Sequence, residues 1–136
     1  MIEVISIPLF ALILPLILIP IEKILPYPHI IEELAKLVLV LMIYQKEKQL
    51  NKLLSFFVIL SGILFTLSES IFYLINIFNL GNLTIFPTRL LLTGTMHVST
   101  LMIIYLIGRK NNVSLLMSLF FSIIIHYQYN IWAAGL

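Results

Sequence analysis

Seven ionisable side chains stand in stretches of sequence that are otherwise apolar. They are Glu32, Glu33, Lys36, Glu69, Arg89, His97 and His126. An ionisable group among hydrocarbon costs roughly 2.5–3.5 kcal/mol on insertion scales, so such residues generally mark a functional site. Carboxylates and imidazoles can act as general acids or bases, bind divalent metal ions or relay protons. Acid–base catalysis, metal binding or proton transfer inside an apolar environment is therefore the chemistry that these residue types permit.

Helical spacing gathers these residues into one polar stripe on each of four segments. Residues four or seven apart lie on the same face of an α-helix. Glu32 and Lys36 are four apart, so they share a face and can pair. The other stripes are Gly62, Phe65, Glu69, Tyr73 and Asn76; Arg89, Thr93 and His97; and His126 with Asn130. In a bundle surrounded by lipid, polar stripes turn toward one another, which predicts one shared site.

The composition of the chain indicates what surrounds the helices that carry these stripes. Of the 136 residues, 61% are hydrophobic and 10% are charged, whereas soluble domains are ~45–50% apolar and ~25% charged. Lipid must therefore surround most of the chain. The absence of cysteine and aspartate excludes thiol nucleophiles, disulfides and aspartyl dyads. With a net charge of +2 and so little soluble surface, no nucleic-acid partner is expected.

The fold class predicted is all-α, a polytopic transmembrane helical bundle of about five spans in the lipid bilayer. A span needs ~20 largely apolar residues. Breaks rich in proline, lysine, glycine and asparagine divide the chain, residues 1–136, which we treat as a single integral membrane domain. The predicted spans are 2–20, 28–45, 52–79, 86–108 and 112–134. The first segment lacks a basic amino-terminal region and a small-residue cleavage site, so it is expected to be retained.

The charges of the loops predict an orientation in the cell membrane. The 46–52 loop carries three lysines, and the 108–112 loop carries Arg109 and Lys110. The positive-inside rule makes both loops cytoplasmic. With five spans, the N-terminus is then cytoplasmic and the C-terminus extracytoplasmic. Counted along each helix at ~1.5 Å per residue, the polar stripes reach similar depths, near the middle or in the outer half of the membrane.

The stripes also carry a resemblance to a known family. Glu32-Glu33-Leu34-Ala35-Lys36 matches the Glu-Glu-x-x-Lys motif of the PrsW proteases, and the segment from Gly62 through Phe65 and Glu69 to Tyr73 looks like their second motif. The remaining matches are Arg89, Thr93, Gly94 and His97 on the next helix and His126-x-x-x-Asn130 on the last. Four motifs in the family's order, over roughly residues 30–134, make the chain similar to this family. The family shares a superfamily with type II CAAX prenyl proteases and bacteriocin-processing or immunity proteins.

The resemblance implies an intramembrane peptidase in which the four motif helices form the protease core and the substrate is a membrane-anchored protein. In the mechanism expected here, Glu32 or Glu33 is the general base for a water, and analogy with the superfamily favours Glu32. Glu69 and His97 would hold the water or move its proton. His126 and Asn130 would donate hydrogen bonds to the oxyanion of the tetrahedral intermediate. Lys36 and Arg89 would balance the carboxylate charge.

Several alternatives remain open from the sequence. Glu32, Glu69, His97 and His126 could instead bind a divalent metal such as Zn, although the metal-free glutamate mechanism is placed slightly ahead. A non-catalytic scaffold or immunity-type partner would use the same residues for binding or stability. A proton- or ion-coupled transporter would use them as a relay, but no inverted repeat is present. A homo-oligomer would enclose the polar stripes more fully.

Overall fold

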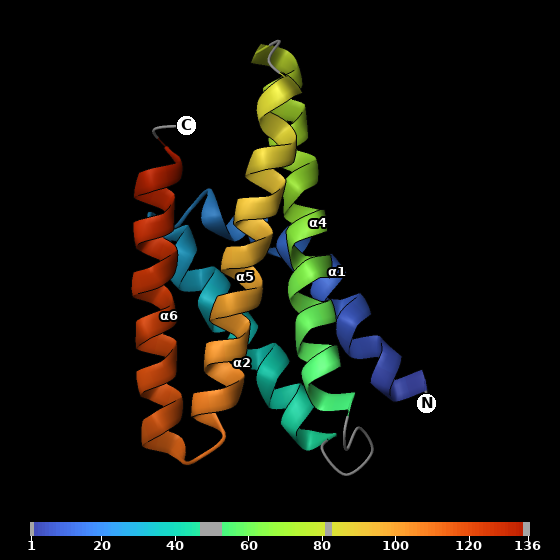
Figure 1. The fold of residues 1–136 in the computed structure, drawn as a ribbon, viewed down its shortest axis with the longest axis vertical. Coiled ribbons are helices and arrows are strands. Elements are labelled where there is room, and N and C mark those ends of the chain that lie inside the picture. The colour runs from blue at the N-terminus through green and yellow to red at the C-terminus, as the bar shows by residue number, and fades with distance from the viewer. Residues whose placement is uncertain (1, 47–52, 81–82, 135–136) are drawn as a thin grey trace.

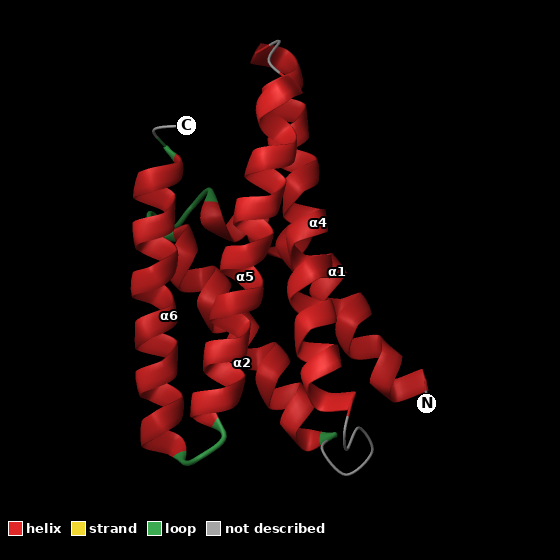
Figure 2. Cartoon of the chain, in the orientation of Figure 1, coloured by secondary structure: helices red, strands yellow, loops and turns green. Residues whose placement is uncertain are grey.

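The computed structural model describes residues 2–46, 53–80 and 83–134, and within them the fold is all-helical, as predicted (Figures 1 and 2). Five long α-helices account for nearly all of these residues. They are α1 (Ile2–Glu22), α2 (Pro28–Gln45), α4 (Leu54–Leu80), α5 (Phe86–Gly108) and α6 (Asn112–Ala133). A short 3-10 helix, η2 (Leu83–Ile85), leads into α5. The predicted segments match these bounds to within a few residues; Lys52 lies outside the described residues.

Four of the described helices are long and apolar enough to cross a membrane, and the chain is an integral membrane protein. These stretches are Ile5–Glu22, Leu54–Ile75, Leu83–Gly108 and Asn112–Ala133. Helix α2, the second predicted span, is not among them. Its 18 residues include Glu32, Glu33 and Lys36, which lower its apolar character. That α2 also crosses the bilayer therefore stays a prediction.

The charges of α2 are accommodated because this helix packs against α1, α4, α5 and α6. One face of it is buried completely. The residues with no exposed surface are Glu33, Lys36, Leu39, Val40 and Ile43, and their spacing of three and four residues is that of a single helical face. Charged side chains on this face meet protein groups rather than lipid, so α2 can be less apolar than its neighbours.

Local sequence signals explain where the helices begin. Pro28 occupies the first turn of α2, where its missing N–H would have no partner within the helix. Asn111 caps α6, because its side-chain oxygen accepts a hydrogen bond of 2.8 Å from the backbone N–H of Ser114. Both signals fall where the sequence predicts breaks. Of the lysine-rich loop at 46–52, all but Lys46 lies outside the described residues.

The arrangement of the helices brings particular ends together. Helices α4, α5 and α6 run up and down beside one another, and α1 packs on α4 (Figure 1). The C-terminal ends of α2 and α5 lie at the same end of the bundle as the start of α1, and the C-terminal end of α6 lies at the opposite end (Figure 1). The predicted orientation requires this arrangement. The outer surface is rich in exposed apolar side chains, such as Leu91, Leu116 and Phe120, as expected for contact with lipid.

Candidate active site

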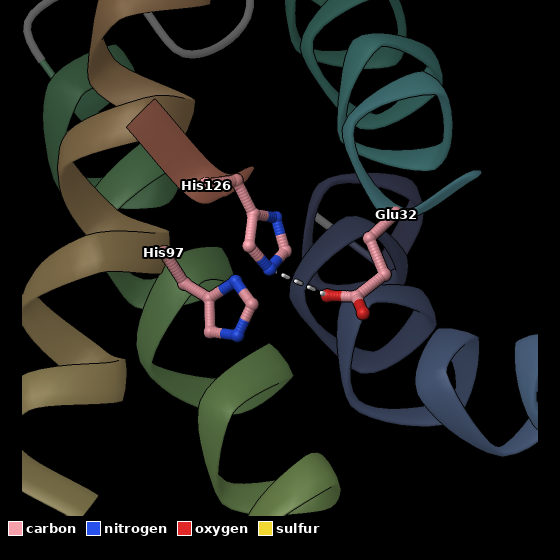
Figure 3. Close-up of side chains that lie close together, drawn as sticks. All are labelled: Glu32, His97 and His126. Carbon is pink, nitrogen blue, oxygen red and sulfur yellow. Dashed lines mark ion pairs between the residues drawn. The ribbon is translucent and has the colours of Figure 1, made fainter. Parts of the chain in front are cut away.

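Side chains from three helices converge on one buried point. Glu32 of α2, His97 of α5 and His126 of α6 each offer a ligand atom, and these atoms all lie within 4.8 Å of one another. Figure 3 shows the two imidazole rings and the carboxylate facing a common space. Glu32 Oε2 is 3.8 Å from His126 Nε2, and the two rings lie nearly perpendicular, with centroids 5.4 Å apart.

Two of the polar atoms at this point lack a hydrogen-bond partner in the protein, which fits a bound cation. Glu32 Oε2 and His97 Nδ1 are both buried without a hydrogen-bond partner. An unpaired buried polar atom costs about 1–3 kcal/mol, so such atoms need a ligand or a water. Two imidazole nitrogens and one carboxylate oxygen form a donor set that suits zinc and related divalent ions. The residues present therefore fit a divalent metal.

Glu33 lies behind His126 and carries the buried ion pair of α2. Its Oε1 accepts hydrogen bonds from Lys36 Nζ at 2.5 Å and from His126 Nδ1 at 2.8 Å. Lys36 also donates to Thr100 Oγ1 at 3.0 Å. The pairing of Lys36 with Glu32 that the spacing allows is not formed, because Lys36 bonds the glutamate three residues before it. Because Lys36 bonds Glu33, the Glu32 carboxylate faces the two histidines instead.

The hydrogen bond to Glu33 fixes the form of His126. A carboxylate only accepts, so the imidazole hydrogen lies on Nδ1. Nε2 then presents a lone pair toward Glu32 and the common space. Metal-binding histidines usually donate their second nitrogen to a carboxylate or carbonyl in this way, which orients the ring. Glu33 thus bonds the far side of the His126 ring and is not part of the group formed by Glu32, His97 and His126.

His97 is held in the same manner by a different carboxylate. Its Nε2 forms a hydrogen bond with Glu69 Oε2 of α4, and its ring lies 4.9 Å from that of Phe65. With Nε2 donating to Glu69, Nδ1 is the nitrogen left with a lone pair. Of the four metal ligands that the sequence offered, the structure gathers Glu32, His97 and His126, and it places Glu69 on the other nitrogen of His97.

A cavity of about 350 Å³ opens beside this cluster. Its polar lining comes from all five long helices. The polar residues are Glu22, Glu32, Glu69, Tyr73, Arg89, His126, Tyr129 and Asn130. The Arg89 guanidinium lies over the Tyr73 ring, 4.4 Å from the centroid, in a cation–π contact. The cavity is large enough for a short stretch of peptide beside Glu32 and His126.

Sequence reasoning missed three residues of this region. Thr100 bonds Lys36 and stands three residues after His97, so the helical face of His97 could have revealed it. Tyr129 lines the cavity and shares a hydrogen bond of 2.6 Å with Thr93. Glu22 also lines the cavity but belongs to α1, where no motif or polar stripe drew attention to it.

Comparison with families of known proteins supports the reading of the motifs. Residues 28–135 match the PrsW-protease family, described as PrsW family intramembrane metalloprotease. The matched region contains every residue that the sequence predicts for the site, and it begins where α2 begins. Searches of curated proteins and of solved structures found no match. Because the match covers most of the chain, the protein belongs to the PrsW family of intramembrane metalloproteases.

Proposed function

We propose that this protein is a metal-dependent peptidase that hydrolyses one peptide bond of a membrane-anchored protein. The observation that carries the proposal is the convergence of Glu32, His97 and His126, with ligand atoms within 4.8 Å of one another. Two of these residues hold buried polar atoms without partners. The cavity beside them is where a substrate segment would lie.

Glu32, His97 and His126 would hold a divalent ion such as Zn²⁺. When bound, the ion polarises the scissile carbonyl and makes a water nucleophilic near neutral pH. Three protein ligands are the usual number in a catalytic zinc site, because one position must stay open for water and substrate. Glu33 and Glu69 would act behind the two histidines by fixing the direction of each ring.

Proton transfer is assigned to Glu69. One of its oxygens bonds His97, and the residue also lines the cavity. Glu69 takes a proton from the attacking water as the new C–O bond forms. It then delivers this proton to the leaving amine as the C–N bond breaks, which completes hydrolysis with atoms and charge in balance.

Asn130 and Arg89 complete the proposed site. Asn130 lies one turn beyond His126 and lines the cavity, so its amide can donate a hydrogen bond to the oxyanion. Arg89 balances the cavity's carboxylates from the α5 wall, where Tyr73 holds its guanidinium. Lys36 balances Glu33 within the buried pair.

The metal-free alternative makes Glu32 the general base rather than a ligand. The unpartnered Glu32 Oε2 and His97 Nδ1 favour the metal, because a carboxylate base alone would leave the imidazole nitrogen unused. Chelation separates the two mechanisms. It abolishes hydrolysis by the metal-dependent route and leaves the glutamate route unchanged.

The test is cleavage by the purified protein in detergent of a panel of single-span membrane proteins, with fragments identified by mass spectrometry. The expected result is cleavage by the wild type that chelator removes and zinc restores. Glu32→Gln, His97→Ala and His126→Ala should each stop it while remaining folded. Equal cleavage by the wild type and all three variants would contradict the proposed site. Binding of membrane partners without cleavage would favour a scaffold or immunity-type role.

A further inference from the structure

Helix α1 forms a wall of the cavity even though it lies outside the residues matched to the family. Pro15, Ile19 and Glu22 line the cavity from this helix. Their spacing of four and then three residues places them on one helical face. Two are apolar, and the third is a carboxylate at the last residue of the helix. Among the described residues, Glu22 is the only charged side chain that α1 contributes to the lining of the cavity.

Glu22 has no cationic partner among the residues that the structure describes. The charged groups that act on it are two further carboxylates, Glu69 and Glu32, which repel it. The side chain is only partly buried, so it stays accessible from the cavity. Neighbouring Lys23 is exposed and does not line the cavity. A carboxylate held near a like charge at the rim of a cavity is stabilised by any cation that enters.

The other charges of the cavity already have partners or a proposed role. Glu69 bonds His97, and Glu32 faces the two histidines. Arg89 is stacked on Tyr73 and forms no ion pair with Glu22 in the described part of the chain. The carboxylate of Glu22 is therefore the group left to meet a charge brought by the substrate.

We infer that Glu22 is a specificity-determining residue that receives a lysine or arginine side chain of the substrate beside the scissile bond. The inference rests on the proposed function, since it names what the same cavity selects. Glu22 ends the apolar stretch of α1. At that depth a lysine or arginine of a single-span protein keeps its charged end near the interface while its stem lies among apolar groups. Such a side chain matches both the apolar wall and the carboxylate.

Binding of single-span peptides to the detergent-solubilised full chain tests the inference without requiring chemistry. Three labelled peptides of about 20 apolar residues would carry Lys, Gln or Glu at the same position in their outer turn. Dissociation constants would be measured by fluorescence anisotropy for the wild type, Glu22→Gln, Glu22→Lys and the control Lys23→Gln. Cleavage of the same peptides would be measured separately.

The wild type and Lys23→Gln should bind the Lys peptide roughly three- to tenfold more tightly than the Gln peptide, the range of a partly buried ion pair. Glu22→Gln should lose this preference, and Glu22→Lys should shift it to the Glu peptide. Equal or undetectable binding of the three peptides by the wild type overturns the inference, as does a lysine preference that survives in Glu22→Gln. A lysine preference without cleavage would support the inference and contradict the proposed peptidase. Cleavage without a preference would do the reverse.

Discussion

At the scale of residues, the two histidines of the site are held by the same kind of hydrogen bond. Each imidazole bonds a carboxylate through one nitrogen, Glu33 for His126 and Glu69 for His97. The other nitrogen is left for the space that Glu32 enters. Fixing the tautomer by a hydrogen bond behind the ring is how a protein directs a lone pair at a chosen point. The two carboxylates behind the rings therefore belong to the same hydrogen-bonded arrangement as the residues that face the space.

The Glu33–Lys36 pair supports a prediction that separates stability from activity. In Glu33→Gln the Lys36 ammonium, which has no exposed surface, loses its counter-charge. Leaving one partner of a buried ion pair uncompensated costs roughly 3–5 kcal/mol, and the thermal midpoint in detergent should fall accordingly. Activity should fall as well, because His126 Nδ1 loses its carboxylate acceptor.

The double variant Glu33→Gln/Lys36→Met serves as the control. It removes both charges and should recover most of the thermal stability. Peptide hydrolysis should remain low, because His126 is still without its orienting carboxylate. Full recovery of activity in the double variant would show that Glu33 serves only to neutralise Lys36.

Metal binding gives a second prediction that does not depend on turnover. A ligand present at a hundredfold excess over its dissociation constant stabilises the folded state by about 2.7 kcal/mol. For a chain of this size, zinc should therefore raise the thermal midpoint by roughly 5–10 °C, and chelator should reverse the rise. His126→Ala should abolish the shift because it removes one of three ligands.

His29→Ala is the matched control for this measurement. His29 lies close to the site, with its ring centroid 6.3 Å from that of His126, but it is not part of the convergent group. Its substitution should leave the zinc-dependent shift intact. A shift that persists in His126→Ala, or that disappears in His29→Ala, would place the ion elsewhere.

The residues of the site were predictable from the sequence to the extent that helical spacing determines them. Glu69, His97 and His126 each stand in a polar stripe of an apolar helix, and the structure brings them close together. Which glutamate pairs with Lys36 was not predictable from the sequence. Both Glu32 and Glu33 can reach Lys36, and the positions of Thr100 and His126 around α2 decide between them. The place of Glu22 in the cavity was not predictable either, because it depends on where α1 packs against the other helices.

At the scale of elements, the close contact of α4 with α5 places Glu69 beside His97. Gly62 of α4 makes this contact possible, because a Cβ there would lie 2.9 Å from Val98 Cγ2 and 3.0 Å from Val98 Cα. Small residues commonly permit such approach between helices in membranes. A Cβ at Gly94, on the facing helix, would lie 3.5 Å from Thr66 Cγ2, an ordinary van der Waals distance.

The two glycines therefore predict opposite outcomes for the same substitution. Gly62→Ala should destabilise the protein by roughly 1–3 kcal/mol, because the backbone and the stiff side chain of Val98 cannot yield without moving α5. That movement should also reduce activity by separating Glu69 from His97. Gly94→Ala should be neutral or slightly stabilising, since alanine favours helix more than glycine does. Thermal midpoints and peptidase rates of the two variants make the comparison, and equal effects would contradict it.

Helix α2 shows how far an element can be predicted from composition. Its position and length follow from Pro28 and from the apolar run after Lys36, and both agree with the structure. Its role as a span does not follow from apolar content, because three charged residues lie within it. What allows these charges is burial against the four other long helices, which depends on the whole bundle rather than on the segment itself.

At the scale of the whole molecule, the orientation in the membrane is predicted from the charges of the loops and from the arrangement of the helix ends. The basic residues Arg109 and Lys110 follow α5, and the lysine-rich segment begins at Lys46 after α2. Figure 1 places the ends of these two helices on one side of the bundle. One membrane face can therefore receive both basic segments, as the positive-inside rule requires.

The absence of cysteine from the chain makes this orientation directly testable. Single cysteines at Ile24, Gln45, Asn112 and Ala134, all exposed positions, would each provide one reactive thiol without removing a basic residue. Their reaction with a membrane-impermeant maleimide would be measured in right-side-out and in inverted vesicles. With five spans, Gln45→Cys and Asn112→Cys should react from the cytoplasmic face, and Ile24→Cys and Ala134→Cys from the opposite face. If α2 does not cross the bilayer while the other four helices do, Ile24→Cys, Gln45→Cys and Asn112→Cys should all react from one face, and Ala134→Cys alone from the other. The two outcomes differ in whether Ile24→Cys and Gln45→Cys react from opposite faces or from the same face, so the experiment decides whether the helix that carries Glu32 is itself a span.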